Sequence, residues 1–376
     1  MGYESIVIGG GVIGSAIALR LAQAGRRTLV LERSIPGAEA SSAAAGILGP
    51  QIEGHGPDPL FQLGLESREA YPSLAEELRE LAGIDVGFTR CGLLHVAMEG
   101  EDPAPWEARF AWQRQAGLEV ERLSGDEVRA LEPGLSPRIS LALHFPREGR
   151  VDPRALARAL PLAAERAGAH FRAARVLGVA VEGGRVVGVD VEGERIPAAN
   201  VVVAAGAWTS LVQGLPLPAG VVEPLRGQMV ELADEGLSLG RIVFSSRGYV
   251  VPRGEGRVVA GSTMERAGFD KRVTAEGVQR ILDQATATLP SLAKAEPRAL
   301  WAGLRPCPAD GLPLIGETEV EGLFVCSGHH RNGILLTPIS AALLARAVIE
   351  GKEPEALSPF SPRRFSRPVS PEARGG

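Results

Sequence analysis

Apolar residues near the N-terminus follow first a strand pattern and then a helical one. Ser5–Ile8 is a short apolar run that ends in glycines, and over Ile13–Leu21 apolar residues recur at helical spacing until Gly25. Thr28–Leu31 is a second apolar run, and Glu32 follows it directly. This order predicts a βαβ unit, whose two strands must be parallel.

The pattern changes in the next part of the chain. Residues 41–49 are mostly small, and residues 54–59 are rich in glycine and proline, which predicts a flexible surface loop able to act as a lid. Helical spacing over 61–81 predicts a long helix. Residues 83–145 mix short strands with one helix, and we interpret them as an inserted lobe.

A polar residue followed by proline marks the next helix start. Asp152 is suited to the N-cap position and Pro153 to the first helical position. Three apolar runs then follow, at 176–181, 186–191 and 196–205, with glycines between the first two pairs. They predict a β-meander that leads into a fully apolar strand.

The last part of the chain returns to alternating strands. Residues 221–300 predict strands with one helix near 275–289, and a final helix is expected over 334–350. The segment 359–376 is rich in proline and arginine and is expected to be a disordered tail. No internal repeat or long linker occurs, so the two lobes are expected to interleave along the sequence.

Composition excludes several classes of protein. Of the 376 residues, 45% are hydrophobic and 23% are charged, which is typical of a soluble globular chain, and no apolar stretch is long enough to span a membrane. The net charge of -5 provides no basic field for nucleic acid. Three cysteines in no CxxC arrangement predict neither a disulfide framework nor a metal cage, and the six histidines lack metal-ligand spacing. The sequence starts directly with a strand pattern and no export signal, so we expect a cytoplasmic protein without a metal.

A glycine motif lies between the first predicted strand and helix. Residues 9–14 read Gly-Gly-Gly-Val-Ile-Gly and match GxGxxG. Gly9 would permit the tight turn, Gly11 the approach of a pyrophosphate, and Gly14 the close packing of helix on strand. Glu32, at the end of the next strand, would accept hydrogen bonds from a ribose diol. The motif predicts a dinucleotide site and leaves open whether the dinucleotide is FAD or NAD.

Five blocks, in this order along the chain, resemble the D-amino acid oxidase superfamily of flavoproteins, with the closest likeness to the glycine oxidases. The blocks are Gly9–Gly14 with Glu32, Ser41–Gly46, Val201–Trp208, Trp301–Gly316 and Gly328–Leu335. The resemblance implies an α/β fold in which a Rossmann-like FAD-binding domain (1–83, 146–218 and 300–358) is interleaved with an antiparallel-sheet substrate-binding domain (84–145 and 219–299). It also implies FAD as the cofactor, held without a covalent bond.

The resemblance assigns residues along the whole length of FAD. Glu32 would bind the adenosine ribose, Val176 would lie beside the adenine, and Arg331–Leu335 would lie by the flavin ring. The last predicted helix would then direct its N-terminal N–H groups toward the flavin N1/C2=O region, where negative charge gathers on reduction. The implied cofactor-binding residues are Gly9, Gly11, Val12, Ile13, Gly14, Glu32, Arg33, Ser41, Ser42, Ala45, Gly46, Ile47, Val176, Gly206, Gly303, Gly328, Arg331, Asn332, Gly333, Ile334 and Leu335.

The resemblance also implies the catalytic residues Arg305, Tyr249 and Arg331. An arginine fork binds a carboxylate by two parallel charged hydrogen bonds, and Tyr249 would be its hydroxyl partner. In the family the substrate reacts as a neutral amine and its α-hydrogen leaves as hydride, so no further catalytic group is required. From the residues alone, a structural salt bridge is the alternative role for Arg305. Cys307 lies near a position at which sarcosine oxidases bond covalently to flavin, but flanking prolines make such a bond the minor alternative.

The substrate pocket is expected to include Gly49, Ile52, Arg247 and Met264. Two of these depart from the family pattern: Arg247 replaces a histidine, and Ile52 replaces a small residue. If both face the entrance, Ile52 narrows it and Arg247 offers a second anionic contact, so small substrates such as glycine or sarcosine should be preferred over D-phenylalanine. The alternative is that Arg247 points to solvent and Ile52 packs under the lid.

The expected activity is FAD-dependent oxidative deamination of glycine, sarcosine or a small D-amino acid. Hydride transfer to flavin would be followed by reduction of oxygen to hydrogen peroxide, and in the family the imine product can enter synthesis of the thiamine thiazole. One alternative is a dehydrogenase for D-amino acids, sarcosine or proline that uses another electron acceptor. A second alternative is a flavin-binding subunit without turnover. A homo-oligomer is compatible with the sequence, and the small amino acid and oxygen are the expected partners.

Overall fold

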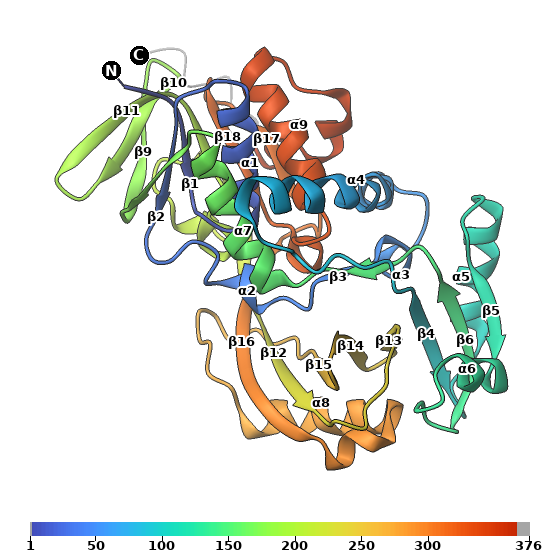
Figure 1. Ribbon diagram of the computed structural model, residues 1–376. Coiled ribbons are helices and arrows are strands. Elements are labelled where there is room, and N and C mark those ends of the chain that lie inside the picture. The colour runs from blue at the N-terminus through green and yellow to red at the C-terminus, as the bar shows by residue number, and fades with distance from the viewer. Residues whose placement is uncertain (1, 367–376) are drawn as a thin grey trace.

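The structure, a computed structural model that describes residues 2–366, contains two eight-stranded sheets (Figure 1). In the first sheet the strand order is β17-β18-β11-β1-β2-β8, and β9 and β10 extend β11 as an antiparallel meander. Its strands are β1 (Tyr3–Ile8), β2 (Thr28–Glu32), β8 (His170–Ala173), β9 (Val176–Glu182), β10 (Arg185–Val191), β11 (Glu194–Val203), β17 (Leu314–Glu317) and β18 (Leu323–Ser327).

The centre of the first sheet is parallel. Strand β1 pairs in parallel with β2 and β11, β2 with β8, and β11 with β18. Helix α1 (Val12–Gln23) joins β1 to β2 and completes the predicted βαβ unit. The α/β fold with a Rossmann-like first lobe is therefore confirmed.

Alternating residues of the central strands enter two different cores. Val7 and Val30 pack with the helices, whereas Ile6, Ile8 and Leu29 pack with the meander β9–β10. Successive side chains of a strand point to opposite faces, so helices cover one face of this sheet and the meander covers the other. The covering helices are α1, α4 (Pro59–Ala82), α7 (Pro153–Arg166) and α9 (Thr337–Glu350).

Local signals set two of these helix starts. The carboxylate of Asp152 accepts hydrogen bonds from the N–H groups of Arg154 (2.8 Å) and Ala155 (3.2 Å), which confirms the predicted cap of α7. Helix α9 starts at Thr337 and not at Ile334 as predicted. Because Pro338 favours the first turn of a helix, the regular helix begins there, and a short 3-10 turn (η3, His330–Asn332) precedes it.

The second sheet has the order β16-β12-β15-β14-β13-β4-β6-β5 and is antiparallel except for the pair β13 and β4. Helix α8 (Ala275–Thr288) packs on it, below the sheet in Figure 1. The strands are β4 (Leu93–Met98), β5 (Glu121–Ser124), β6 (Ile139–Phe145), β12 (Val222–Ala233), β13 (Ile242–Ser245), β14 (Gly248–Gly254), β15 (Arg257–Gly261) and β16 (Glu296–Pro308).

Two helices lie at the edge formed by β5 and β6, although the sequence pattern predicts only one. Helix α5 (Ala104–Gln115) is the predicted one, and α6 (Gly125–Leu131) is additional. The missed signal is a capping box in which Ser124 and Glu127 bond reciprocally.

Short elements connect the two lobes. They are α2 (Ala40–Ala43), α3 (Pro50–Glu53), the strand pair β3 (Ile47–Leu48) and β7 (Gly149–Arg150), and the 3-10 turn η1 (Gly206–Leu211). The 3-10 turn η2 (Pro290–Lys294) instead lies within the second lobe, between α8 and β16. Strand β16 pairs with β12 from Glu296 to Pro308, with one register shift between Pro297 and Ala299, and the pairing continues across the predicted boundary at residue 300. The domain boundaries themselves remain a prediction.

The predicted tail is ordered in its first part. Turns η4 (Glu355–Phe360) and η5 (Pro362–Phe365) pack on the first lobe, Phe360 is buried, and Arg364 pairs with Asp310 at 2.7 Å. The prediction of disorder is therefore wrong for 359–366, because buried apolar contacts and ion pairs hold this segment, and 367–376 lie outside the described residues. No helix in the described part of the chain is both long and apolar enough to cross a membrane.

Candidate active site

A cavity of about 910 Å³ lies between the two lobes. Its wall on the first lobe includes Ile8, Glu32 and Ser327, which end the parallel strands β1, β2 and β18. Its wall on the second lobe includes Tyr249 and Arg305. Ligands of open α/β sheets bind outside the carboxyl ends of the strands, so this position is typical of a cofactor site.

The glycine loop fits closely against its surroundings. Gly9 has a φ of +104°, and a Cβ there would lie 2.5 Å from the Ala204 carbonyl oxygen. A Cβ on Gly14 would lie 2.0 Å from the Gly9 carbonyl oxygen, so this glycine allows helix α1 to pack against the turn. Gly11 is the N-cap of α1 and lines the cavity with Val12 and Ile13. The N-terminus of α1, with its positive dipole end, thus faces the cavity.

Glu32 closes this end of the cavity. Its carboxylate accepts hydrogen bonds from the N–H groups of Gly10 (2.8 Å) and Ser34 (3.0 Å). Arg33 stacks on the Trp208 ring at 3.9 Å from the ring centroid. Each carboxylate oxygen of Glu32 keeps a free lone pair, which leaves it able to accept a ribose hydroxyl.

The second lobe holds the loop around Ser41 in place. The Ser41 hydroxyl accepts a hydrogen bond from the Val12 N–H (3.0 Å), and the Trp301 indole donates to the Ala43 carbonyl (3.0 Å). The Arg253 guanidinium donates to the carbonyl of Ala45, and burial lowers the pKa of Arg253 to about 10, which leaves it charged at neutral pH. The loop that borders the cavity is therefore fixed from both lobes.

Arg305 lies at the opposite end of the cavity. Its Nη2 donates to the Ser262 hydroxyl (2.6 Å), and its Nη1 donates to the Thr263 carbonyl (3.2 Å). Both acceptors are neutral, and within residues 2–366 no carboxylate forms an ion pair with Arg305. The structural salt bridge considered for this arginine is absent, and the charge of the guanidinium remains available to an anion.

Tyr249 borders the same part of the cavity. Its hydroxyl donates to the Met229 sulfur at 3.5 Å, a weak acceptor, and its ring lies 5.6 Å from that of Phe244. Because sulfur is a poor partner, the hydroxyl is free to turn toward a ligand.

Arg331 and His330 also line the cavity, and both have nitrogen atoms that can form hydrogen bonds. Arg331 pairs with Glu53 at 2.9 Å. His330 has a φ of +48°, and its buried Nε2 has no hydrogen-bond partner among residues 2–366. Burial, together with the charges of Arg305 and Arg331, lowers the pKa of His330 to about 4, so the ring is neutral at pH 7 and can donate or accept a hydrogen bond. Its neighbour His329 is instead packed, with Nε2 at 3.1 Å from the Ser340 hydroxyl.

Most of the predicted site residues line the cavity. In addition to those above, these are Ala45, Gly46, Ile47, Gly49, Val176, Gly206, Arg247, Met264, Gly303, Asn332, Gly333 and Ile334. The predicted residues outside the lining set are Gly14, Ser42, Ile52, Gly328 and Leu335. Cys307 is outside it as well, and its thiol lies 3.8 Å from the Pro308 carbonyl oxygen.

Ile52 corrects the pocket predicted from the sequence. It is 6% exposed and packs in a core with Trp106, Leu141 and Phe145. The same cluster contains Ala45 and Tyr249 of the cavity wall, so Ile52 packs behind this wall and outside the lining residues, which favours the alternative in which it packs under the lid.

Three residues of the site were not predicted from the sequence: Glu53, Ser262 and His330. Ser262 had a signal, because a small polar residue that follows directly on an apolar strand lies at a strand end, where binding residues often occur. The histidines were considered as metal ligands, and Glu53 had no signal, since its partner Arg331 is distant in sequence.

The residues present fit FAD. The cavity has the size of a large ligand site, its adenosine end offers helix N–H groups and an acceptor carboxylate, and its other end holds the buried, unpartnered nitrogen of His330. A Cβ on Gly206 would meet no atom within 4 Å, so this glycine leaves open space.

Comparison with known proteins agrees with this geometry. The family described as FAD dependent oxidoreductase (DAO) matches residues 4–347. The chain is 38% identical to glycine oxidase of Geobacillus kaustophilus over 98% of this chain and 99% of that protein, whose crystal structure superposes with a TM-score of 0.92. It is 30% identical to the crystal structure of iminodiacetate oxidase from Chelativorans sp. BNC1 (TM-score 0.86; 96% and 99% of the two chains covered). It is also 34% identical to the bifunctional protein ThiO/ThiG of Trichormus variabilis, over 98% of this chain and 56% of that protein. The chain therefore belongs to the DAO family of FAD-dependent oxidoreductases, and FAD is its cofactor.

Proposed function

We propose that this protein is an oxidase that deaminates glycine or another small amine-bearing acid and produces hydrogen peroxide. The observation that carries the proposal is the guanidinium of Arg305, which faces the cavity bound only to neutral oxygens. Such a group binds a carboxylate by charge-assisted hydrogen bonds. The relatives named glycine oxidase over nearly the whole chain support the same activity.

The residues of this chain would orient the substrate and leave the redox step to the cofactor. Arg305 would bind the carboxylate and Tyr249 would add a hydroxyl hydrogen bond, which together fix the α-carbon. FAD, when bound, supplies the hydride acceptor. Gly9, Gly11, Glu32 and Ser41 would hold its adenosine and pyrophosphate, as the resemblance to the family implies. His330 is neutral at pH 7, so it would place no positive charge beside the amine of the substrate.

The proposal is tested with the purified holoprotein. Glycine, sarcosine, D-alanine, D-proline and D-phenylalanine are supplied in turn, and peroxide is measured with oxygen as the acceptor. We expect peroxide with glycine or sarcosine. Without oxygen, the same substrates should bleach the flavin absorption band at about 450 nm. Faster reoxidation by an artificial acceptor than by oxygen would favour the dehydrogenase, and no bleaching with any amino acid would favour the non-catalytic subunit.

The binding mode of FAD is tested by acid precipitation. Cys307 lies outside the cavity wall, so we expect yellow colour in the supernatant and not in the pellet. Colour retained in the pellet would indicate a covalent bond.

A second substrate class is supported by Arg247. This side chain lines the cavity, is exposed, and forms no ion pair within residues 2–366. A cation near the entrance would bind a second carboxylate, as in iminodiacetate, the compound named for one structural relative. Substrates with two carboxylates are therefore the second candidates.

We also propose a cytoplasmic location for the protein and a route for its imine product. Cys91, Cys307 and Cys326 are all free thiols, which supports a reducing cytoplasm. The imine product would be a precursor for the thiamine thiazole, and the ThiO/ThiG relatives support this route. A homo-oligomer stays a prediction, to be tested by light scattering.

A further inference from the structure

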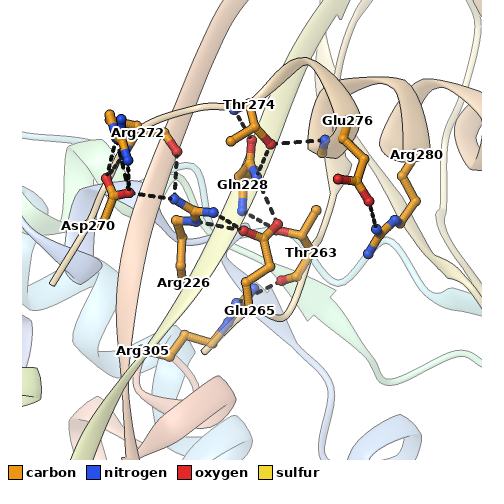
Figure 2. Close-up of polar contacts among 11 residues, drawn as sticks. Arg226, Gln228, Thr263, Glu265, Asp270, Arg272, Thr274, Glu276, Arg280 and Arg305 are labelled. Carbon is orange, nitrogen blue, oxygen red and sulfur yellow. Dashed lines mark hydrogen bonds and ion pairs between the residues drawn. The ribbon is translucent and has the colours of Figure 1, made fainter. Parts of the chain in front are cut away.

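A polar cluster lies behind Arg305, between strand β12, helix α8 and the segment that follows β15 (Figure 2). Arg226 and Gln228 supply it from β12, Glu265 from the segment, and Thr274 from the N-cap of α8. Gln228 is fully buried and Arg226 is 8% exposed. Buried polar groups need partners, and here every member has at least one.

Glu265 is the centre of this cluster. Its Oε1 accepts from Gln228 Nε2 (2.8 Å) and its Oε2 from Arg226 Nε (2.6 Å). The backbones of Arg226 and Glu265 also exchange two hydrogen bonds, of 2.9 and 3.0 Å. Burial favours the neutral acid, but hydrogen bonds from Thr263, Arg226 and Gln228 and the charge of Arg226 hold the pKa of Glu265 below its ordinary value. Glu265 is thus an anion fixed to β12 by its side chain and its backbone.

The segment fixed in this way carries the acceptors of Arg305. Ser262 and Thr263 precede Glu265 and accept the two hydrogen bonds from the guanidinium. The Thr263 hydroxyl accepts in turn from the N–H of Gln228 (2.9 Å). Figure 2 shows Arg305 at one end of this chain of contacts and Arg226 with Asp270 and Arg272 at the other.

Strand geometry places the cluster and Arg305 on different sides of β12. Arg305 lies over Gly227, and Arg226 and Gln228 flank that glycine. Successive side chains of a strand point to opposite faces, so the two flanking side chains point away from Arg305. The segment from Ser262 to Glu265 joins the two faces, with acceptors for Arg305 on one side and Glu265 on the other.

We propose that Glu265 is a positioning residue for Arg305 in the carboxylate binding described above, because it holds Ser262 and Thr263 where they orient the guanidinium. This inference rests on the proposed function. Two of the five N–H groups of Arg305 are used on Ser262 and Thr263, which leaves three that could bind a carboxylate. Without Glu265 the acceptors shift, and the fork loses its fixed direction.

The test compares Glu265→Ala with the control Glu276→Ala. Glu276 is an acid on the neighbouring helix that pairs with Arg280 at 2.7 Å, and within residues 2–366 its side chain forms no ion pair with the cluster around Glu265. Binding of glycolate, which has the carboxylate and lacks the amine, is measured by perturbation of the flavin spectrum in each holoprotein. We expect Glu265→Ala to raise the Kd about tenfold at unchanged FAD content, and Glu276→Ala to leave it unchanged.

A double-mutant cycle of Glu265 and Arg305, measured by steady-state kinetics, distinguishes a positioning role of Glu265 from a general loss of stability. For glycine, Glu265→Ala should raise KM about tenfold and lower kcat less, and in an Arg305→Ala background it should have no further effect on kcat/KM. Glu265→Gln keeps one acceptor oxygen and the shape, so its KM should fall between the native and alanine values. If the alanine variant does not fold, Glu265→Gln carries the same cycle.

Two results would overturn the inference: native glycolate affinity in a folded Glu265 variant, or effects of the Glu265 and Arg305 substitutions that simply multiply. Failure of the proposed function looks different, because the native protein would then oxidise no amino acid, whereas glycolate binding would still report on Arg305 and Glu265.

Discussion

Gly227 leaves the space that the guanidinium of Arg305 occupies: a Cβ at Gly227 would lie 1.9 Å from Nη1 of that arginine. The atoms it would meet are the far end of a flexible side chain, so Gly227→Ala should fold and displace Arg305. We expect kcat/KM for glycine to fall by on the order of a hundredfold, since a misplacement of about 1 Å has that effect in other enzymes. Gly236→Ala, where a Cβ would make only ordinary contact at 3.5 Å, is the control. A native rate for Gly227→Ala would mean that the observed position of Arg305 is not the active one.

Removal of Arg305 itself tests the carboxylate site. Because a charged hydrogen bond contributes about 1.5 to 3 kcal/mol, Arg305→Ala should lower kcat/KM by roughly tenfold to more than a hundredfold at normal FAD content. Arg305→Lys should also be impaired, since a single ammonium cannot replace the fork. Steady-state kinetics with glycine decide this, and full activity of either variant would give Arg305 a structural role only.

Arg247 distinguishes substrates with one carboxylate from those with two. In Arg247→Ala, kcat/KM for iminodiacetate should fall about two- to fivefold, the range of an exposed ion pair, whereas that for sarcosine should stay near the native value. Raising the salt concentration should reduce the difference, because exposed charges are screened. Equal losses for both substrates would exclude a specific second carboxylate contact.

Ile52→Ala should affect stability and not selectivity. Its side chain is buried among apolar neighbours and outside the residues that line the cavity, and removing such a side chain costs about 2 to 5 kcal/mol. Thermal unfolding should show the lower Tm, and the ratio of kcat/KM for glycine to that for D-phenylalanine should stay unchanged. A changed ratio would restore Ile52 to the pocket.

Glu148 should make stability depend on pH. It is fully buried, and burial raises the pKa of its carboxyl from 4.5 to about 8, although Arg68 lies 3.3 Å away. Between these values the folded state keeps a proton that the unfolded state loses. The contribution of protonated Glu148 to the free energy of unfolding is therefore complete below pH 4.5 and is lost as the pH rises through about 8.

The uncharged variant Glu148→Gln removes this titration. Its Tm relative to the native protein should rise by at least about 2 °C between pH 5 and pH 8.5, as measured by calorimetry. A difference in Tm for Glu148→Gln that stays constant with pH would contradict the shifted pKa.

The parts of the fold that could be predicted from the sequence are those that depend on local signals. The βαβ unit, its glycine turn and the Asp152 cap each depend on residues close together in sequence, and all three occur as expected. The contacts that set the chemistry are long-range: Arg305 with Ser262, and Arg331 with Glu53. The spacing of apolar residues along the chain does not predict contacts between residues so far apart in sequence. Ile52 was misplaced for the same reason, since the lobe that buries it follows later in the chain.

Strand β16 also limits how the protein can move. Trp301, which holds the loop beside the cofactor site, and Arg305, proposed to hold the carboxylate, lie four residues apart on this one strand. At about 3.3 Å per residue their Cα atoms are separated by roughly 13 Å of paired backbone. A swing of one lobe against the other would carry both anchors together. We therefore expect substrate to enter by displacement of loops, and an insertion or deletion between Trp301 and Arg305 should abolish catalysis even where the fold survives.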